Sequence, residues 1–404
     1  MHVTGLITEY NPFHNGHLYH IQKTREITGA DYVIVVMSGN FVQRGAPAMI
    51  DKYTRTEMAL KGGADLVIEL PAAFAASSAE NFAAAGIALL NGLGIVDSIC
   101  FGSECGDVKL LKLIAKLLAK EPPALSDSIK AFLKEGFSYP EARANGILSY
   151  LGNKNSEKMT EILKSPNNIL GIEYIKAIIK SQSSIQPYTI KRQGTGYHDA
   201  ALTLEQNISS ATAIRLALEK KDGIDRIQAY VPDFVFTELK SSPYVTSNDF
   251  SSLLSYCLLS SSEDTLVHYS DVSKELASRI YKNRLQLNQF DEFTEHLKTK
   301  QYTYTRISRS LFHILLNIKK TDIENYKNNN YMNYARILGF RYRSKELLTA
   351  LKKQSLLPMV TKIADVNYPL LNHEIFASHL YNSVVFHKYG TILKNEYTRG
   401  IIIL

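Results

Sequence analysis

Short apolar runs alternate with longer stretches through the first hundred residues, and this alternation restricts the chain to few folds. The apolar runs occupy residues 3–8, 32–37, 65–70 and 98–101. The stretches between them end at glycines, which commonly stop helices, namely Gly29, Gly62, Gly63, Gly92 and Gly94. Because parallel strands need crossover connections, usually helices, this order predicts an α/β fold built on a parallel sheet. Ligands of such sheets bind beyond the carboxyl ends of the strands.

A turn with two histidines follows the first apolar run. Residues 10–20 read Tyr-Asn-Pro-Phe-His-Asn-Gly-His-Leu-Tyr-His. Pro12 cannot continue a strand ladder, and Gly16 lets backbone approach a ligand closely. The helix that follows directs its unpaired N–H groups at the turn, and His14 and His17, three residues apart, can face one anion. We therefore predict a site for the phosphates of ATP; the alternative is that both histidines are surface or capping residues.

Composition and charge are those of a globular protein. The 404 residues are 45% hydrophobic and 21% charged, enough for two or three domains with cores of their own. The net charge of +7 permits a polyanionic partner without requiring one. Three cysteines are too few for a disulfide framework or a zinc site, which favours a reduced, cytoplasmic setting.

No part of the sequence resembles a membrane segment or a leader. Met1 leads directly into the first apolar run, without a charged and apolar leader region. No apolar stretch approaches the roughly 20 residues that a membrane helix needs. We therefore expect no membrane association, and we expect the apolar residues 401–404 to form a docked terminal strand.

The residue composition of the chain changes near residue 221, after which we expect a mainly helical part. Residues 298–353 contain 13 basic and 3 acidic residues, with tyrosines interleaved. Cations suit RNA phosphates and aromatic rings suit unpaired bases, so this stretch predicts an RNA-binding surface. The alternative is a solvated basic face. The tentative RNA contacts are Arg336, Arg341, Arg343, Lys345 and Lys352.

A second signature lies further along the first half. Residues 210–215 read Ser-Ala-Thr-Ala-Ile-Arg and open a helix, with Ser209 or Ser210 as its N-cap. Together with His14-Asn-Gly-His17 it resembles the HxGH nucleotidylyltransferase superfamily, although Ala211 replaces the second serine of the S-S-T-x-I-R pattern. The resemblance implies that Ser210, Thr212 and Arg215 hold the β and γ phosphates of ATP.

Further blocks extend this resemblance over nearly the whole chain. They are Glu9-Tyr-Asn-Pro-Phe-His-Asn-Gly-His-Leu, Met37-Ser-Gly-Asn-Phe-Val-Gln-Arg-Gly, Phe101-Gly-Ser-Glu, Pro166-Asn-Asn-Ile-Leu-Gly-Ile-Glu-Tyr, Tyr197-His-Asp and Tyr334-Ala-Arg-Ile-Leu-Gly-Phe. In this order they resemble the tRNA(Met) cytidine acetate ligase family. The resemblance implies a Rossmann-like, ATP-binding catalytic domain over residues 1–220 and a mainly helical, basic, tRNA-binding domain over residues 221–404.

The family resemblance also implies a reaction and its substrates. Members activate acetate with ATP to acetyl-adenylate, release pyrophosphate, and transfer the acetyl group to N4 of the wobble cytidine of elongator tRNA(Met). Acetate becomes a good electrophile only with a leaving group such as AMP, and an anticodon base is already single-stranded. Mg²⁺ is expected to enter with ATP, and no protein partner is implied.

Site residues follow from the resemblance, position by position. His14 and His17 are the catalytic candidates. The ATP-binding candidates are Ile7, Thr8, Glu9, Tyr10, Asn11, Pro12, Phe13, His14, Asn15, Gly16, His17, Leu18, Tyr19, His20, Gly102, Asn167, Arg192, Ser210, Thr212 and Arg215. Structural alternatives remain for three of the positions: Gly102 as a turn residue, Asn167 or Asn168 as a helix cap, and Arg192 in a surface ion pair.

Several polar residues have a less certain place in this scheme. The candidates for contacts with acetate, phosphate or RNA are Gln43, Arg44, Lys52 and Arg55, while His198 and Asp199 suit local caps better. No residue is identified as the base that accepts the cytosine proton. Two other functions stay open: an adenylyltransferase acting on a small phosphorylated metabolite, and a non-catalytic tRNA-binding factor.

Overall fold

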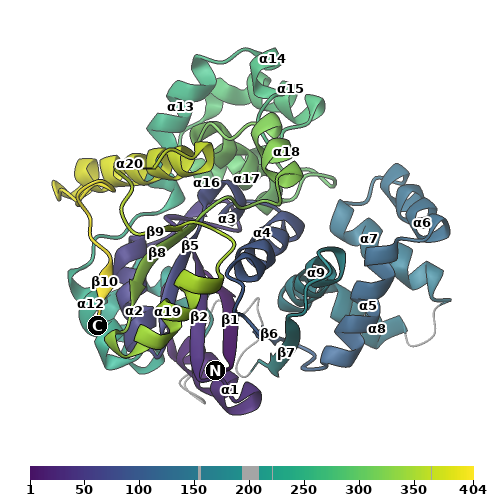
Figure 1. Cartoon of the computed structure of the whole chain (residues 1–404). Helices are drawn as coiled ribbons and strands as arrows, with labels where there is room; N and C mark the ends of the chain where they lie inside the picture. The colour runs from purple at the N-terminus through teal and green to yellow at the C-terminus, as the bar shows by residue number, and fades with distance from the viewer. Residues whose placement is uncertain (153–155, 193–208, 221, 365) are drawn as a thin grey trace.

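A central sheet of eight strands organises the chain, as the computed structural model shows (Figure 1). The structure describes residues 1–152, 156–192, 209–220, 222–364 and 366–404. The strand order is β10-β8-β5-β2-β1-β6-β7, with β9 paired to β8. The strands span β1 Val3–Thr8, β2 Tyr32–Ser38, β5 Leu66–Leu70, β6 Ser98–Ser103, β7 Gln186–Lys191, β8 Ala335–Phe340, β9 Met359–Val360 and β10 Ile402–Ile403.

The parallel part of the sheet confirms the fold class that the sequence predicts. Strands β5, β2, β1, β6 and β7 all run in the same direction. Their common carboxyl edge carries the loops that follow β1, β2 and β5. A small antiparallel pair, β3 (Phe41–Val42) with β4 (Ala46–Pro47), extends the loop after β2. Ligand contacts are expected at this edge.

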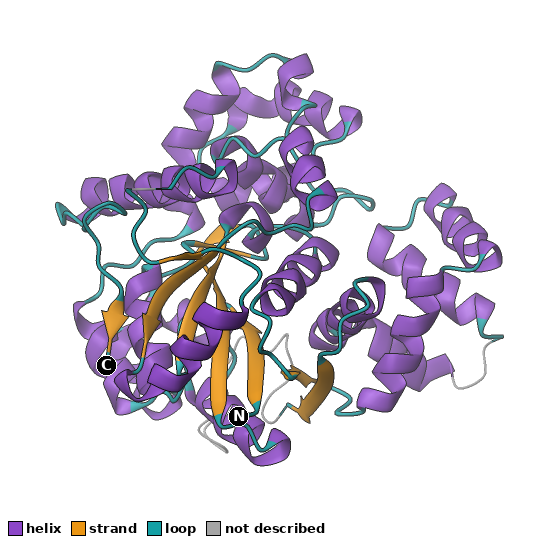
Figure 2. Ribbon diagram, viewed as in Figure 1, coloured by secondary structure: helices purple, strands orange, loops and turns teal. Residues whose placement is uncertain are grey.

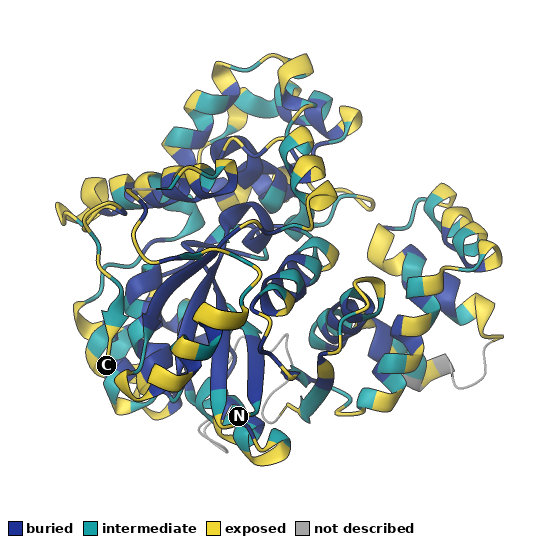
Figure 3. Cartoon of the chain, in the orientation of Figure 1, coloured by how far each residue is buried: buried dark blue, intermediate teal, exposed yellow. Residues whose placement is uncertain are grey.

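Helices cover both faces of the sheet, because alternate residues of each strand point to opposite sides. On one face Val33 and Val35 pack with α1 (Asn15–Thr28) and α2 (Lys52–Lys61) in one apolar cluster. On the other, Ile34 and Val36 pack with α4 (Ala79–Gly92) and α9 (Pro166–Lys180) in a second cluster. Figure 3 shows the central strands as almost wholly buried.

The remaining helices come from two stretches of the chain, one before β7 and one after it (Figure 2). Between β6 and β7 the chain forms α5 Val108–Lys120, α6 Pro123–Lys134, α7 Tyr139–Tyr150 and α8 Ser156–Lys164. After β7 it forms α10 Ala211–Leu218, α11 Gly223–Arg226, α12 Asp233–Ser241, α13 Ser251–Leu259, α14 Glu263–Leu266, α15 Lys274–Asn283, α16 Phe290–Leu297, α17 Tyr304–Leu315, α18 Lys320–Asn328, α19 Lys345–Gln354 and α20 Pro369–Tyr389. The short helix α3, Ala72–Ala75, follows β5. No helix in the described part of the chain is long and apolar enough to cross a membrane.

The second half of the chain is mainly helical, as expected, but it also completes the central sheet. Strand β8 pairs with β5 in the antiparallel direction, and β10 pairs with β8. The predicted terminal strand at residues 401–404 is therefore confirmed as β10. The domain boundary at residues 220 and 221 stays a prediction, since elements from both sides of it share one sheet.

A buried cluster of charges joins the two halves. The Lys52 ammonium contacts Glu69 of β5 and two carboxylates from the C-terminal region, Glu374 and Glu396, at 3.3 and 3.1 Å. The Arg336 guanidinium, in β8, pairs with Glu396 as well. All five side chains are at most 5% exposed. A buried charge is tolerated only with such partners.

This cluster corrects two of the sequence-based assignments. Arg336 is not a surface contact for tRNA, because its guanidinium is buried and neutralised by Glu396. Lys52 is equally unavailable to acetate, phosphate or RNA, since its ammonium is enclosed by carboxylates. Both cations instead hold the C-terminal segments against the sheet.

The buried cluster gives the protein a pH-dependent stability. Burial, and then the negative charge of Glu69, raises the pKa of Glu374 from 4.5 to about 8. The folded state thus binds this proton more tightly than the unfolded chain, so the stabilisation is lost as pH rises through about 8. In chemical denaturation between pH 7 and 9, we expect the free energy of unfolding to fall for the wild type and to change less for Glu374→Gln.

Glu238→Gln is the matched control, because Glu238 pairs with Lys61 at the surface. We expect this variant to keep the wild-type pH dependence. Equal slopes for Glu374→Gln and the wild type would show that the Glu374 proton does not contribute.

Candidate active site

The loop after β1 is held in place by its own buried side chains. Tyr10 adopts a left-handed backbone conformation with a φ of 48°, and its ring packs against Phe13. Phe13 in turn fills space above Gly62, where an added Cβ would come within 2.5 Å of the ring. The Asn11 side-chain oxygen accepts a hydrogen bond of 2.8 Å from the Met49 N–H. These three predicted ATP contacts therefore have side chains that hold the turn in shape.

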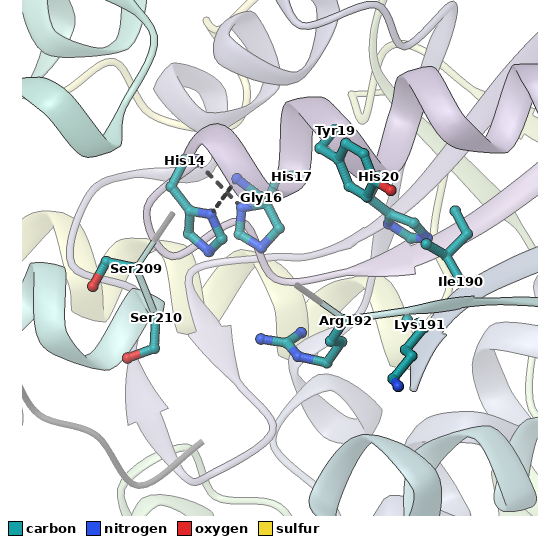
Figure 4. A pocket seen from close by; sticks show the side chains of 11 residues that line it. His14, Gly16, His17, Tyr19, His20, Ile190, Lys191, Arg192, Ser209 and Ser210 are labelled. Carbon is teal, nitrogen blue, oxygen red and sulfur yellow. Dashed lines mark hydrogen bonds between the residues drawn. The ribbon is translucent and has the colours of Figure 1, made fainter. Parts of the chain in front are cut away.

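The two histidines of the turn present the same kind of donor. The His14 Nδ1 accepts from the Gly16 N–H at 3.1 Å, which makes His14 the N-cap of α1. The His17 Nδ1 accepts from the His14 N–H at 3.3 Å. With both Nδ1 atoms occupied as acceptors, each neutral ring carries its proton on Nε2. The rings are stacked, with centroids 3.6 Å apart, and lie together at one cavity (Figure 4).

Burial keeps these imidazoles neutral. Burial, and then the positive charges of Arg192 and Arg215, lowers the pKa of His14 from 6.5 to about 3. Burial, followed by His14, lowers the pKa of His17 well below 6.5. Near neutral pH the pair therefore donates two N–H groups without adding a charge. Such donors suit negative charge that develops on an anionic ligand.

The opposite wall of the cavity comes from β6, β7 and α10. Gly102 lies one residue before the end of β6, beside Arg192, and a Cβ at this position would come 3.3 Å from the Arg192 Cγ. Ser210 caps α10 by accepting from the Ala213 N–H at 3.1 Å. Ser209 lies beside it, with a buried hydroxyl that has no partner among the described residues. Arg192, Ser209 and Ser210 thus face the histidines across one space (Figure 4).

Arg215 connects α10 to the histidine turn. Its guanidinium donates to the Asn11 carbonyl at 2.8 Å and to the Thr212 hydroxyl at 3.2 Å. The two signatures, 200 residues apart in sequence, therefore meet as predicted. Thr212 is oriented toward Arg215 by this bond.

The cavity unites many of the predicted residues and adds three. Predicted residues that line it are His14, Gly16, His17, Tyr19, His20, Gly102, Arg192 and Ser210. Sequence reasoning did not include Ile190, Lys191 and Ser209 in the site, although they flank Arg192 and Ser210. The remaining ATP-binding assignments stay predictions. The Tyr197-His198-Asp199 motif lies outside the described residues.

The asparagines at the start of α9 are held by Glu104. The Glu104 carboxylate accepts from the Asn167 backbone and side chain and from the Asn168 N–H, at 2.7 to 3.2 Å. The Asn168 side-chain oxygen accepts from the Cys105 N–H at 3.1 Å. This arrangement joins the turn after β6 to the positive end of α9. Asn167 would need to exchange its bond with Glu104 to contact a nucleotide.

Arg55 has a structural role in place of the ligand contact considered from the sequence. Its fully buried guanidinium donates to the backbone carbonyls of Glu9 at 2.6 Å, Ser38 at 3.0 Å and Gly39. A side chain so enclosed cannot reach a substrate, so that assignment is wrong. It instead links the loops after β1 and β2.

The tentative tRNA contacts in α19 and the segment before it lie at the amino edge of the sheet. The Arg341 N–H donates to the carbonyl of Asp65, the residue before β5, and Arg343 pairs with the Asp65 carboxylate. Because β5 is parallel to β1, this is the edge opposite the histidine turn. Arg341, Arg343, Lys345 and Lys352 thus remain predicted RNA contacts, on a surface remote from the cavity.

Comparisons with known proteins agree with this geometry. A family model of HIGH nucleotidyl transferases matches residues 1–396. The chain is 42% identical to the tRNA(Met) cytidine acetate ligase of Clostridium perfringens, with 95% of each chain covered. It is 44% identical to the protein of the same name from Thermoanaerobacter sp., covering 99% of this chain and 98% of that one. The crystal structure of Thermotoga maritima TmcAL bound with alpha-thio ATP is similar over 100% of both chains, with a TM-score of 0.91 and 32% identity.

The capping role of His14 can be separated from its imidazole. Asparagine is also a good N-cap, whereas alanine is not. We expect His14→Ala to lower the free energy of unfolding by about 1 kcal/mol more than His14→Asn does, as measured by chemical denaturation. Equal losses for the two variants would mean that the Nδ1 contact with Gly16 contributes nothing to the helix.

The protonation states of the histidines can be measured directly. In NMR spectra of protein with labelled histidine rings, we expect the His14 and His17 signals to keep the neutral, Nε2-protonated pattern between pH 8 and 5. In denaturant, the same rings should titrate with a pKa of about 6.5. Protonation of either folded ring above pH 6 would contradict the electrostatic description of the site.

Proposed function

Because the chain belongs to the tRNA(Met) cytidine acetate ligase family of HIGH nucleotidyl transferases, we propose that it activates acetate with ATP and acetylates N4 of the wobble cytidine of elongator tRNA(Met). The observation that carries this proposal is the pair of neutral imidazoles facing Arg192 and the N-terminus of α10. Residues 1–220 would supply the ATP site, and residues 221–404 would contribute to tRNA binding.

The first step forms a mixed anhydride. An acetate oxygen attacks the α phosphorus of ATP, the bond to the bridging oxygen of the β phosphate breaks, and pyrophosphate leaves. His14 and His17 would donate their Nε2–H groups to the phosphate oxygens on which charge builds. Arg192, Arg215 and the positive end of α10 would balance the charge of the departing pyrophosphate.

The second step transfers the acetyl group to RNA. The exocyclic N4 of cytosine attacks the carbonyl carbon of acetyl-adenylate, the carbon–oxygen bond to phosphate breaks, and AMP leaves. The amine loses one proton to solvent water as the amide forms. Its lone pair is delocalised into the ring, so placing the base against a reactive anhydride supplies much of the catalysis.

We regard Mg²⁺ as part of the substrate, entering with ATP. It usually keeps water and phosphate oxygens as ligands and needs few protein groups. The described residues contain no group of three or more His, Cys, Asp or Glu side chains suited to hold an ion. The neutral histidines and the arginines of the pocket would therefore act on a triphosphate that carries its own cation.

Exchange between labelled pyrophosphate and ATP tests the first step. We expect exchange only when acetate is present, because acetyl-adenylate formation is then reversible on the enzyme. His14→Asn, which keeps a helix cap, should lower the exchange rate about 10²–10³-fold through loss of one charge-stabilising donor. Exchange that ignores acetate would instead support an adenylyltransferase acting on a small phosphorylated metabolite.

Mass spectrometry of tRNA nucleosides tests the second step. Purified protein with ATP, acetate and elongator tRNA(Met) should yield N4-acetylcytidine, and omission of acetate should abolish it. Acetylation that persists unchanged in His14→Asn would contradict a catalytic role for the turn. A wild-type protein that binds the tRNA but yields no N4-acetylcytidine would instead support a non-catalytic tRNA-binding factor.

A further inference from the structure

A second cavity, of about 380 Å³, lies on the face of the sheet opposite the histidine pocket. Its walls come from α7 and α9 on one side and from the start of α17 on the other. These elements precede and follow residue 221, so the cavity lies between the two predicted domains. A volume of this size is within the range of small-ligand sites, about 300–1,000 Å³. A role for this cavity in RNA binding rests on the proposed acetylation of tRNA.

This interdomain cleft adjoins the loop that carries the histidines. Gln43 lines the cleft, and its backbone N–H donates to the Glu9 carboxylate at 3.0 Å. The Gln43 side chain donates to the Ser77 carbonyl at 3.2 Å, next to the N-cap of α4. Glu9 begins the loop after β1 that leads to His14. The cleft and the histidine pocket therefore open on either side of one loop at the carboxyl edge.

The acidic groups of the cleft are already neutralised. Glu173 pairs with Arg143 and Lys176, and Lys176 also pairs with Glu80. Asp271, at the far side, pairs with the Arg309 guanidinium at 2.9 Å. The lining contains three arginines and three carboxylates, and the pairing leaves one of the arginines for an external anion. A phosphate group is the complementary partner for that guanidinium.

Two side chains supply the contacts that single-stranded RNA needs. Arg306 forms no ion pair within the described chain, and its guanidinium lies over the Tyr302 ring at 4.8 Å. Tyr139 opens α7 with 51% of its surface exposed, a large aromatic plane at the cleft. Arginine suits a phosphate, and an exposed ring suits an unpaired base. Gln301, Thr303 and Thr305 add polar groups for base edges.

We propose that the interdomain cleft binds an unpaired nucleotide that flanks the reacting cytidine in the anticodon loop. Tyr139 stacks on its base and Arg306 contacts its phosphate. The nucleotide on one side of the Glu9 loop then positions the neighbouring cytidine toward the histidine pocket on the other. The cleft thereby selects tRNA, while the pocket activates acetate.

The test compares Arg306→Gln and Tyr139→Leu with a matched control, Arg284→Gln. Arg284 also stacks on a tyrosine, Tyr281 at 3.7 Å, and does not line the cleft. Stacking on a base predicts that Tyr139→Leu weakens binding of an anticodon stem-loop RNA about fivefold or more. Arg306→Gln should lose one phosphate contact. Log affinity should then fall less steeply with log salt, with a slope smaller in magnitude by about 0.7. The control should match the wild type in both measurements.

Two further measurements separate a failure of the cleft assignment from a failure of the proposed function. A blunt RNA duplex of the same stem, without the loop, should bind the wild type and both cleft variants alike. Acetate-dependent pyrophosphate exchange reports the histidine pocket separately. If exchange depends on acetate but both cleft variants bind the stem-loop with wild-type affinity and salt slope, the cleft assignment is overturned. If pyrophosphate exchange in the wild type does not depend on acetate, the proposed function fails instead, whatever RNA affinity the cleft variants show.

Discussion

The fully buried guanidinium of Arg55 holds together the strand ends on which the candidate site is built. It donates to carbonyls of Glu9, Ser38 and Gly39, at the carboxyl ends of β1 and β2. Left without a donor, each carbonyl would be a buried polar group costing about 1–3 kcal/mol. The loop with His14, and the loop with Gln43, both begin at carbonyls that this one side chain fixes. Pocket and cleft therefore share a common anchor.

Buried charge also explains why the two halves of the chain form one body. The cluster around Lys52 contains carboxylates from β5 and from the C-terminal region, and Arg336 from β8. Removing one partner from such a cluster commonly costs about 3–5 kcal/mol. The helical half is thus tied to the sheet by ionic contacts in addition to strands β8 and β10. Helix α17 is held to the loops at the sheet edge, because the Ser308 hydroxyl donates to the Gly45 carbonyl and the His313 ring to the Ala76 carbonyl, and it faces α9 across the second cavity.

Two chemically different environments lie at the carboxyl edge, one on each face of the sheet. On the α1 face, neutral imidazoles and arginines with few acidic neighbours suit a triphosphate. On the α9 face, paired charges, an exposed ring and Arg306 suit an unpaired nucleotide. Such a division matches a reaction in which a small acid must be activated before a large RNA accepts it. The hydrogen bond from the Gln43 N–H to the Glu9 carboxylate joins the loop at the cleft to the loop that carries the histidines.

Local sequence determined the parallel strands, the histidine turn and the helix start at Ser210, because each depends on neighbouring residues: apolar runs, Pro12, Gly16 and a capping hydroxyl. Only the tertiary structure shows that Arg336, Lys52 and Arg55 are buried, because in the sequence they look like surface cations. Their carboxylate and carbonyl partners come from distant segments, and no local pattern records that burial. The same holds for the interdomain cleft, since Tyr139 and Arg306 come from segments far apart in the sequence and line one cavity only in the folded chain.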